Sequence, residues 1–215
     1  GVRPITQKGR QAMLTLDHIA ICAERLDRGA TDVEAALGLP LQAGGQHAAM
    51  GTHNRLLSLG PDYLEVIAID PDGTAPDQPR WFDLDRFKGQ TRATTWICRC
   101  ADLEAALRAA PAGAGVPWSL SRGDLAWRMA VPTDGKLPFG GLFPALIEWQ
   151  GTAHPAPRLT DLGARLTGVR LYSPEAEALR AALAPLIDDA RLSVIAAPVA
   201  RMETVITTPK GEIVL

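Results

Sequence analysis

Apolar and β-branched residues gather in short runs along the chain, separated by turn-forming residues, and this pattern predicts strands and helices. Residues 14–22 (Leu-Thr-Leu-Asp-His-Ile-Ala-Ile-Cys) are typical of a strand, and residues 30–37 have the spacing of an amphipathic helix. The Gly44-Gly45 region loosens the chain, and two further strands are expected at residues 52–59 and 63–70. We interpret this stretch as a β-α-β-β-β unit.

The same order returns after a linker rich in Pro and Asp at residues 70–79. Five of six residues are identical between positions 32–37 (Asp-Val-Glu-Ala-Ala-Leu) and 102–107 (Asp-Leu-Glu-Ala-Ala-Leu), which favours an internal repeat over coincidence. Asp102 is expected to cap the second helix. The strands predicted for this copy lie at residues 93–100, 118–121, 125–131 and 142–150.

A third, shorter copy is expected near the C-terminus. Ser173-Pro174-Glu175 is a strong helix start between a strand at 167–172 and three further strands at 192–197, 200–207 and 212–215. The predicted fold class is therefore α+β, built from repeated β-α-β-β-β modules. The expected organisation is a flexible tail without chemistry at 1–13, paired modules at 14–70 and 93–151 within a domain at 14–151, and a third unit at 160–215.

Composition narrows the range of functions. The 22 basic and 24 acidic side chains give a net charge of −2, which offers no electrostatic footprint for nucleic acid or an anionic membrane. No apolar run is long enough to span a bilayer. Three cysteines are too few for a disulfide framework and favour a reducing, cytoplasmic location. We therefore expect a small-molecule partner, and neither a nucleic acid nor a membrane.

The paired modules resemble the vicinal oxygen chelate superfamily, and within it the glyoxalase-like domain proteins. The resemblance rests on Leu-Asp-His-Ile-Ala-Ile opening the first module, Tyr-Leu-Glu-Val-Ile closing it, and Gly51-Thr52-His53-Asn54 before the closing strand. It implies that two modules form an open barrel holding a divalent metal, which polarises a substrate with adjacent oxygens. The implied activity is of the lyase or isomerase type.

The resemblance also implies a set of metal ligands. His18 matches the ligand of the first opening strand, and Glu65 and Glu148 match those of the two closing strands. Trp96 falls at the fourth position, where an indole cannot bind a metal, so the cofactor could be absent. The metal would act as a Lewis acid, and either a carboxylate, with Glu65 and Glu148 as the candidates, or a metal-bound water would move the proton.

Other residues are candidates for substrate contact. Alternation on the third strand places His53 with Leu57 and Leu59 on a face that packs on a helix, and Asn54 on a more polar face that suits a cavity. Both are kept as candidate substrate contacts, because a slip of one residue would exchange the two faces. Arg128 is the candidate for an anionic substrate group, with Arg55 and Arg122 as alternatives that the sequence does not separate. His47, in a Gly-rich stretch, is expected to be solvated.

Two other readings compete with a metal-dependent enzyme. A binding or sequestering protein of the same fold needs no metal, and Trp96 would then form a flat apolar wall of its cavity. Alternatively, the third unit makes the protein an assembly module, because its half-open sheet face must be covered; this reasoning favours a homodimer. A site built from Cys22, Cys98 and Cys100 is disfavoured, because the chain has no Cys-x-x-Cys pair. A Gly-x-Ser-x-Gly elbow is also missing from the sequence.

Overall fold

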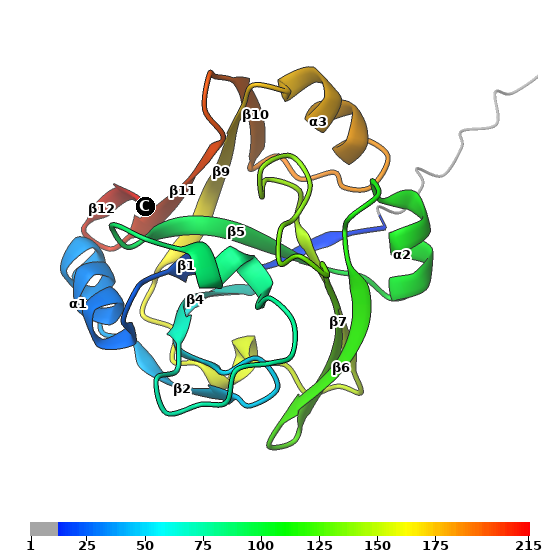
Figure 1. The fold of residues 1–215 in the computed structure, drawn as a ribbon. Helices are drawn as coiled ribbons and strands as arrows, with labels where there is room; N and C mark the ends of the chain where they lie inside the picture. Colours follow the sequence, from blue (N-terminus) through cyan, green and yellow to red (C-terminus); the bar gives the residue numbers. More distant parts are fainter. Residues whose placement is uncertain (1–12) are drawn as a thin grey trace, which may run out of the picture.

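The computed structural model describes residues 13–215 (Figure 1). The predicted N-terminal tail lies, apart from Met13, outside the described residues. Three β-α-β-β-β units follow one another along the chain, as the repeat predicts. The described helices have at most 12 residues, and none of them is long and apolar enough to cross a membrane.

The first module agrees with the prediction apart from one strand. Its helix buries Ala30, Val33 and Leu37 against the sheet and ends at Gly38, whose φ of 67° suits a residue without a Cβ. The segment around Gly44, expected to be loose, is an edge strand. The elements are β1 (Thr15–Cys22), α1 (Leu26–Leu37), β2 (Gln42–His47), β3 (Thr52–Leu59) and β4 (Asp62–Ile69).

The second module repeats this order after a short 3₁₀ segment, η1 (Trp81–Arg86). Asp102 caps its helix as predicted, because its carboxylate accepts a hydrogen bond from the Ala105 backbone N–H at 3.0 Å. The elements are β5 (Arg92–Arg99), α2 (Leu103–Ala109), β6 (Val116–Arg122), β7 (Leu125–Val131) and β8 (Ala145–Gln150).

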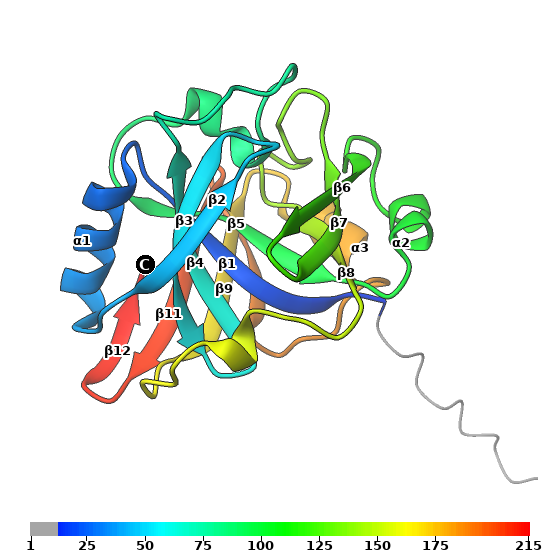
Figure 2. The same ribbon diagram turned by 90° about the horizontal axis from the view of Figure 1, so that it is seen from below.

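The two modules form one curled sheet of eight strands in the order β2-β3-β4-β1-β5-β8-β7-β6 (Figure 2). In each module the opening strand runs parallel to the closing strand, and the two opening strands, β1 and β5, join the modules as antiparallel neighbours. The sheet is mixed, which confirms the predicted α+β class. Its curvature gives it an inner face and an outer face, with α1 and α2 at the two ends of the molecule.

The C-terminal unit has the predicted element order but a different strand pairing. After a one-turn 3₁₀ helix, η2 (Ala156–Arg158), the chain forms β9 (Arg165–Ser173), α3 (Ala176–Leu183), β10 (Leu192–Ala196), β11 (Arg201–Thr208) and β12 (Gly211–Val214). Its sheet has the order β10-β9-β11-β12, and the opening strand runs parallel to the strand that directly follows the helix. A compact β-α-β crossover and a hairpin therefore replace the half-barrel pairing.

This C-terminal sheet covers the outer face of the eight-stranded sheet (Figure 1). Val169, Leu171 and Ile206 belong to the same buried core as Ile19 and Ile21 of β1. The apolar face that motivated a homodimer is thus covered within the chain, and the burial argument for a second copy no longer applies.

Candidate functional site

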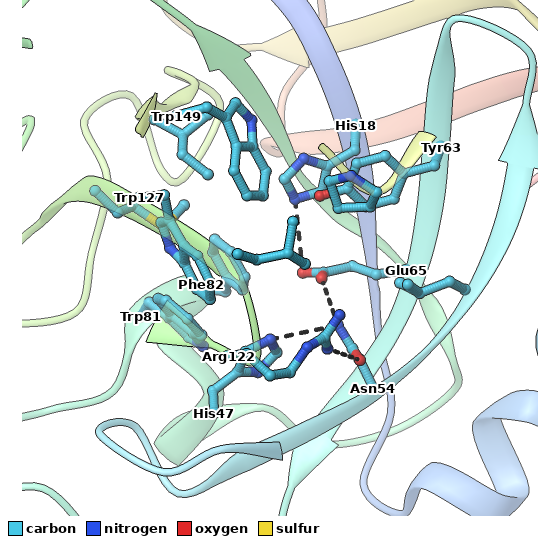
Figure 3. A pocket seen from close by; sticks show the side chains of 15 residues that line it. His18, His47, Asn54, Tyr63, Glu65, Trp81, Phe82, Arg122, Trp127 and Trp149 are labelled. Atoms are coloured by element: carbon cyan, nitrogen blue, oxygen red, sulfur yellow. Dashed lines mark hydrogen bonds and ion pairs between the residues drawn. The ribbon is translucent and has the colours of Figure 1, made fainter. Parts of the chain in front are cut away.

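A pocket lies on the inner face of the curled sheet, with aromatic walls on one side and polar side chains on the other (Figure 3). The centre of a water molecule reaches only about 30 Å³ of it, enough for about two waters. A larger ligand therefore requires the aromatic side chains to move. The lining residues are His18, His47, Asn54, Leu56, Tyr63, Glu65, Trp81, Phe82, Arg122, Leu125, Trp127, Met129, Ile147, Trp149 and Pro155.

A β-bulge in β1 shapes the polar side of the pocket. The register of β1 against β5 shifts between Leu16 and His18, so that Asp17 has no partner on β5. Bulges bend a strand and redirect its side chains, and they are common next to active sites. Here the fully buried Asp17 carboxylate lies 2.7 Å from His18 Nδ1. This hydrogen bond holds the His18 ring by one nitrogen and leaves Nε2 facing the pocket.

Asp17 is the acceptor for three side chains. Besides His18, it binds His154 Nε2 at 2.8 Å and the indole N–H of Trp149 at 3.2 Å. Burial alone would raise the pKa of Asp17, but the hydrogen bonds from His154 and His18 outweigh it and hold the pKa well below its usual range. Asp17 is therefore a fixed negative charge behind His18.

Glu65 faces His18 across the pocket floor. It lies on β4 opposite Ala20, and its Oε1 is 3.9 Å from His18 Nε2, too far for a direct hydrogen bond. Its other oxygen accepts a hydrogen bond from the Asn54 amide at 3.0 Å. Burial raises the pKa of Glu65, while His18 and Asn54 oppose this shift. The floor thus presents two titratable groups that both border the pocket and are not hydrogen-bonded to each other.

Glycines on β2 allow the polar wall to close. A Cβ on Gly44 would lie 2.1 Å from Asn54 Oδ1, and a Cβ on Gly45 would lie 2.6 Å from the Arg122 side chain. Without these side chains, the side-chain oxygen Oδ1 of Asn54 accepts hydrogen bonds from the Gly45 backbone N–H at 3.0 Å and from the Arg122 guanidinium at 3.3 Å. Arg122 is thereby held at the pocket, where its remaining donors suit an anionic group.

Aromatic rings form the rest of the wall. Tyr63 stacks on the His18 imidazole, with ring centroids 4.4 Å apart and planes 9° from parallel. Trp127 and Trp149 lie together on the opposite side, with ring centroids 5.5 Å apart, and Trp81 stacks on Phe82 at 5.3 Å. When these rings move apart to admit a ligand, the lining suits a flat, largely apolar molecule with polar atoms at one end.

The predicted role of Glu148 as a ligand beside His18 and Glu65 is wrong. On β8 the side chains of Ile147 and Trp149 face the pocket, so that Glu148 points to the outer face. There its carboxylate accepts a hydrogen bond from the Leu103 backbone N–H, at the start of α2, at 2.7 Å. The carry-over from Glu65 to Glu148 is therefore off by one residue, which is enough to change the face of a strand.

Three candidate substrate contacts also lie outside the pocket. Trp96 is buried in the core between the two sheets and donates its indole N–H to the Leu142 carbonyl at 2.7 Å. His53 points away from the pocket, on the face of β3 opposite Asn54. Arg128 lies on the outer face and pairs with Glu104 and Glu148. Of the four proposed contacts, the structure brings only Asn54 to the pocket.

Sequence reasoning missed several residues of the pocket. His47 is buried, with 8% of its surface exposed, and contacts Thr52 and Asn54. Asp17 lies in an apolar strand and His154 in a linker, and neither was predicted to belong to the site. The dipeptide Asp17-His18 was the available signal, since a carboxylate inside a buried strand needs a partner. For His154, 137 residues away from Asp17 along the chain, no local signal existed.

The protonation of His47 gives a testable pH dependence. Burial, followed by the charge of Arg122, lowers the pKa of His47 to about 3. Because the unfolded chain binds this proton near pH 6.5 and the folded protein does not, stability is lost as the pH falls below 6.5. His47 alone should lower the free energy of unfolding by up to about 1.4 kcal/mol per pH unit in this range. Urea unfolding at several pH values measures this slope.

The variant His47→Gln should have a smaller slope than the wild type between about pH 6 and 4. Gln46→Ala, an exposed change on the same strand without a titratable group, is the control and should keep the wild-type slope. An unchanged slope in His47→Gln would contradict the assignment.

The pocket does not fit the three-ligand metal site that the resemblance implies. His18 and Glu65 converge, but the third ligand points elsewhere, whereas catalytic zinc sites commonly have three protein ligands. Among residues 13–215, the one cluster close enough for a shared ion is Asp102, Glu104 and Glu148, on the outer face. The three thiols do not converge with His18 either, because Cys98 and Cys100 belong to the core between the sheets.

Comparisons with known proteins agree with this architecture. A hypothetical protein from Staphylococcus aureus has a similar structure, with a TM-score of 0.60 and 12% identity over 87% of this chain and 88% of the other. Methylmalonyl-CoA epimerase from Mycobacterium tuberculosis matches with a TM-score of 0.44 and 18% identity, over 67% of this chain and 93% of the other. A search of curated proteins found no match. The model of the glyoxalase-like domain family covers residues 16–187, most of the chain, and this protein therefore belongs to that family.

Proposed function

We propose that this protein catalyses proton transfer on a small, flat substrate with adjacent oxygens, as an isomerase or lyase. The observation that carries the proposal is the buried line of Asp17, His18 and Glu65 at the pocket floor. Asp17 stays ionised and accepts a hydrogen bond from the N–H at His18 Nδ1, so that the lone pair of Nε2 faces the pocket. This is the arrangement of a general base with its orienting carboxylate.

The remaining groups have complementary roles in this reaction. His18 Nε2 takes a proton from the carbon next to a carbonyl, and the C–H electron pair moves to the carbonyl oxygen. Glu65, whose pKa burial raises, supplies a proton to that oxygen to give an enol. Asn54 and Arg122 orient the oxygens, while the aromatic walls hold the apolar part. Return of the proton to another carbon completes an isomerisation, and loss of a leaving group completes an elimination.

Phenylpyruvate is a suitable probe, because it combines an aromatic ring, adjacent carbonyl and carboxylate oxygens, and exchangeable methylene protons. The wild-type protein should accelerate the exchange of these protons for deuterium in D₂O, followed by NMR, and EDTA should leave the rate unchanged. A rate that EDTA abolishes and a divalent metal restores would instead support the metal-dependent enzyme expected from the sequence. Mass spectrometry of the purified protein, with His18→Ala as control, measures its metal content.

A sequestering protein is the second candidate, and the aromatic lining of the pocket favours it. In this case phenylpyruvate would quench the fluorescence of Trp127 and Trp149 without any acceleration of deuterium exchange. Binding and exchange measured on one sample therefore separate the two functions.

Two further expectations remain proposals. A cytoplasmic location is supported by Cys22, Cys98 and Cys100, which are buried and form no disulfide; fractionation of the producing cells tests it. The homodimer was expected because the sheet face of the third unit needed a cover, and this face is covered within the chain. Light scattering tests it directly, and a monomer mass of 22.9 kDa would exclude it.

A further inference from the structure

A second and wider cavity lies where the paired modules meet the C-terminal unit. The centre of a water molecule reaches about 500 Å³ of it, within the range of about 300–1,000 Å³ common for ligand pockets. Phe82 belongs to the walls of both cavities. The other walls come from the end of η1, the start of β5, the loop between β7 and β8, and the start of β11.

The walls of this cavity carry an excess of positive charge. Four cationic residues, Arg86, Arg92, Lys136 and Arg201, line it together with a single acidic residue, Asp83. Asp83 is already paired with Arg86 at 2.6 Å. The other three cations are therefore not neutralised by the carboxylate in the cavity wall.

Arg92 and Lys136 have no carboxylate within 4.0 Å in the described part of the chain. Arg92 is nevertheless held in place, because its guanidinium lies 4.4 Å from the centre of the Phe87 ring and donates to two backbone carbonyls. Arg201 instead stacks on Tyr172 at 3.7 Å, with Glu203 3.4 Å away, on the face of β11 opposite Met202. Arg92 is thus oriented before any ligand arrives.

The floor of the cavity is apolar. Ala93, Leu137, Leu142 and Met202 line it and are all buried. Positive charge at an exposed rim over an apolar floor suits an amphipathic molecule with an anionic group at one end.

The backbone around this cavity is strained. Phe82, Asp83 and Phe139 are the three residues other than glycine with positive φ in the described chain, with values of 53° to 59°. Two of them line the cavity, and the third directly precedes the lining residue Gly140. A hydrogen bond of 2.9 Å from the Asp83 N–H to the Gly135 carbonyl joins the two strained loops. Such conformations cost free energy and cluster at binding sites.

We propose that this cavity binds a small organic phosphate. The phosphate dianion contacts Arg92 and Lys136, and its apolar part lies on the floor formed by Leu137 and Met202. Guanidinium groups bind phosphate oxygens through paired, charge-assisted hydrogen bonds, and two cations without a carboxylate partner favour a dianion over a single carboxylate. Because Met202 comes from β11, the C-terminal unit supplies part of the apolar floor.

Isothermal titration calorimetry with 1-naphthyl phosphate tests this proposal on the full chain. The wild type should bind it at least about tenfold more tightly than 1-naphthoate, and 1-naphthol should bind weakest. The variants Arg92→Gln and Lys136→Gln should each weaken binding by about tenfold. Ala200→Trp, which fills the cavity but keeps its charges, should abolish binding.

Two control variants locate the binding. Arg108→Ala removes an exposed arginine of α2, and Arg122→Gln changes the aromatic pocket; both should bind 1-naphthyl phosphate as the wild type does. Equal affinity of wild type and Arg92→Gln/Lys136→Gln, equal affinity for 1-naphthoate, or a loss in Arg122→Gln would each overturn the proposal. Urea unfolding confirms that each variant is folded, and the two charge variants serve as independent tests if Ala200→Trp does not fold.

Discussion

The variant His18→Gln should exchange the methylene protons of phenylpyruvate about 10²–10⁴ times more slowly than the wild type. The amide keeps much of the shape of the imidazole and can still contact Asp17, but it has no basic nitrogen to take a proton from carbon. The rate of deuterium exchange, measured by NMR at saturating and subsaturating substrate, reports this loss. Because the pocket shape is preserved, quenching of tryptophan fluorescence should show binding close to that of the wild type.

His53→Gln is the matched control, since it makes the same chemical change on the opposite face of β3. It should exchange at the wild-type rate. Wild-type activity in His18→Gln, or equal losses in the two variants, would rule out His18 as the base.

The variant Asp17→Ala should lower the free energy of unfolding by about 3–5 kcal/mol. Removal of the carboxylate leaves three buried or half-buried donors, on His18, His154 and Trp149, without their acceptor. It also leaves a cavity where the fully buried side chain lay. Urea unfolding at pH 7 measures the change, and Asp17→Asn should fall between Ala and the wild type, because the amide oxygen still accepts hydrogen bonds.

The dependence of stability on acidic pH provides a second test of the role of Asp17. Because the folded pKa of Asp17 lies below its unfolded value, its ionic contribution is complete above about pH 4 and is lost as the pH falls further. The difference in stability between wild type and Asp17→Ala should therefore narrow in acid. Asp124→Ala, in an exposed pair with Arg158, should keep a midpoint near that of the wild type. Similar losses in both variants would contradict a special role for Asp17.

The two cavities share one lining residue. Phe82 lines both the narrow aromatic pocket and the wide basic cavity, and its backbone has a positive φ of 57°. Titrations with phenylpyruvate and 1-naphthyl phosphate, each in the presence of the other, would measure any coupling between the two sites.

Local patterns determined the elements and their order. The repeated helix sequence, the cap at Asp102 and the alternation on β3 are properties of neighbouring residues, and the predicted fold class and repeat depend on little else. The same local information placed Asn54 on the cavity face and His18 and Glu65 on the opening and closing strands of one module. These three residues face one another because β1, β4 and β3 are neighbours in the sheet.

Strand register and long-range packing determined the rest, and the sequence does not encode these locally. One residue of register separates Glu148 from the pocket-facing Trp149, and the bulge at Asp17 changes the pairing of β1 with β5. His154 reaches Asp17 from a linker 137 residues away. The strands of the C-terminal unit pair differently from those of the first two modules, and its sheet covers the outer face of the eight-stranded sheet. Burial of apolar surface is favourable against any apolar partner, so the sequence pattern alone does not say which surface becomes the partner. The sequence by itself thus determined the modules and half of the pocket floor, whereas the tertiary structure decided which carboxylate supports His18.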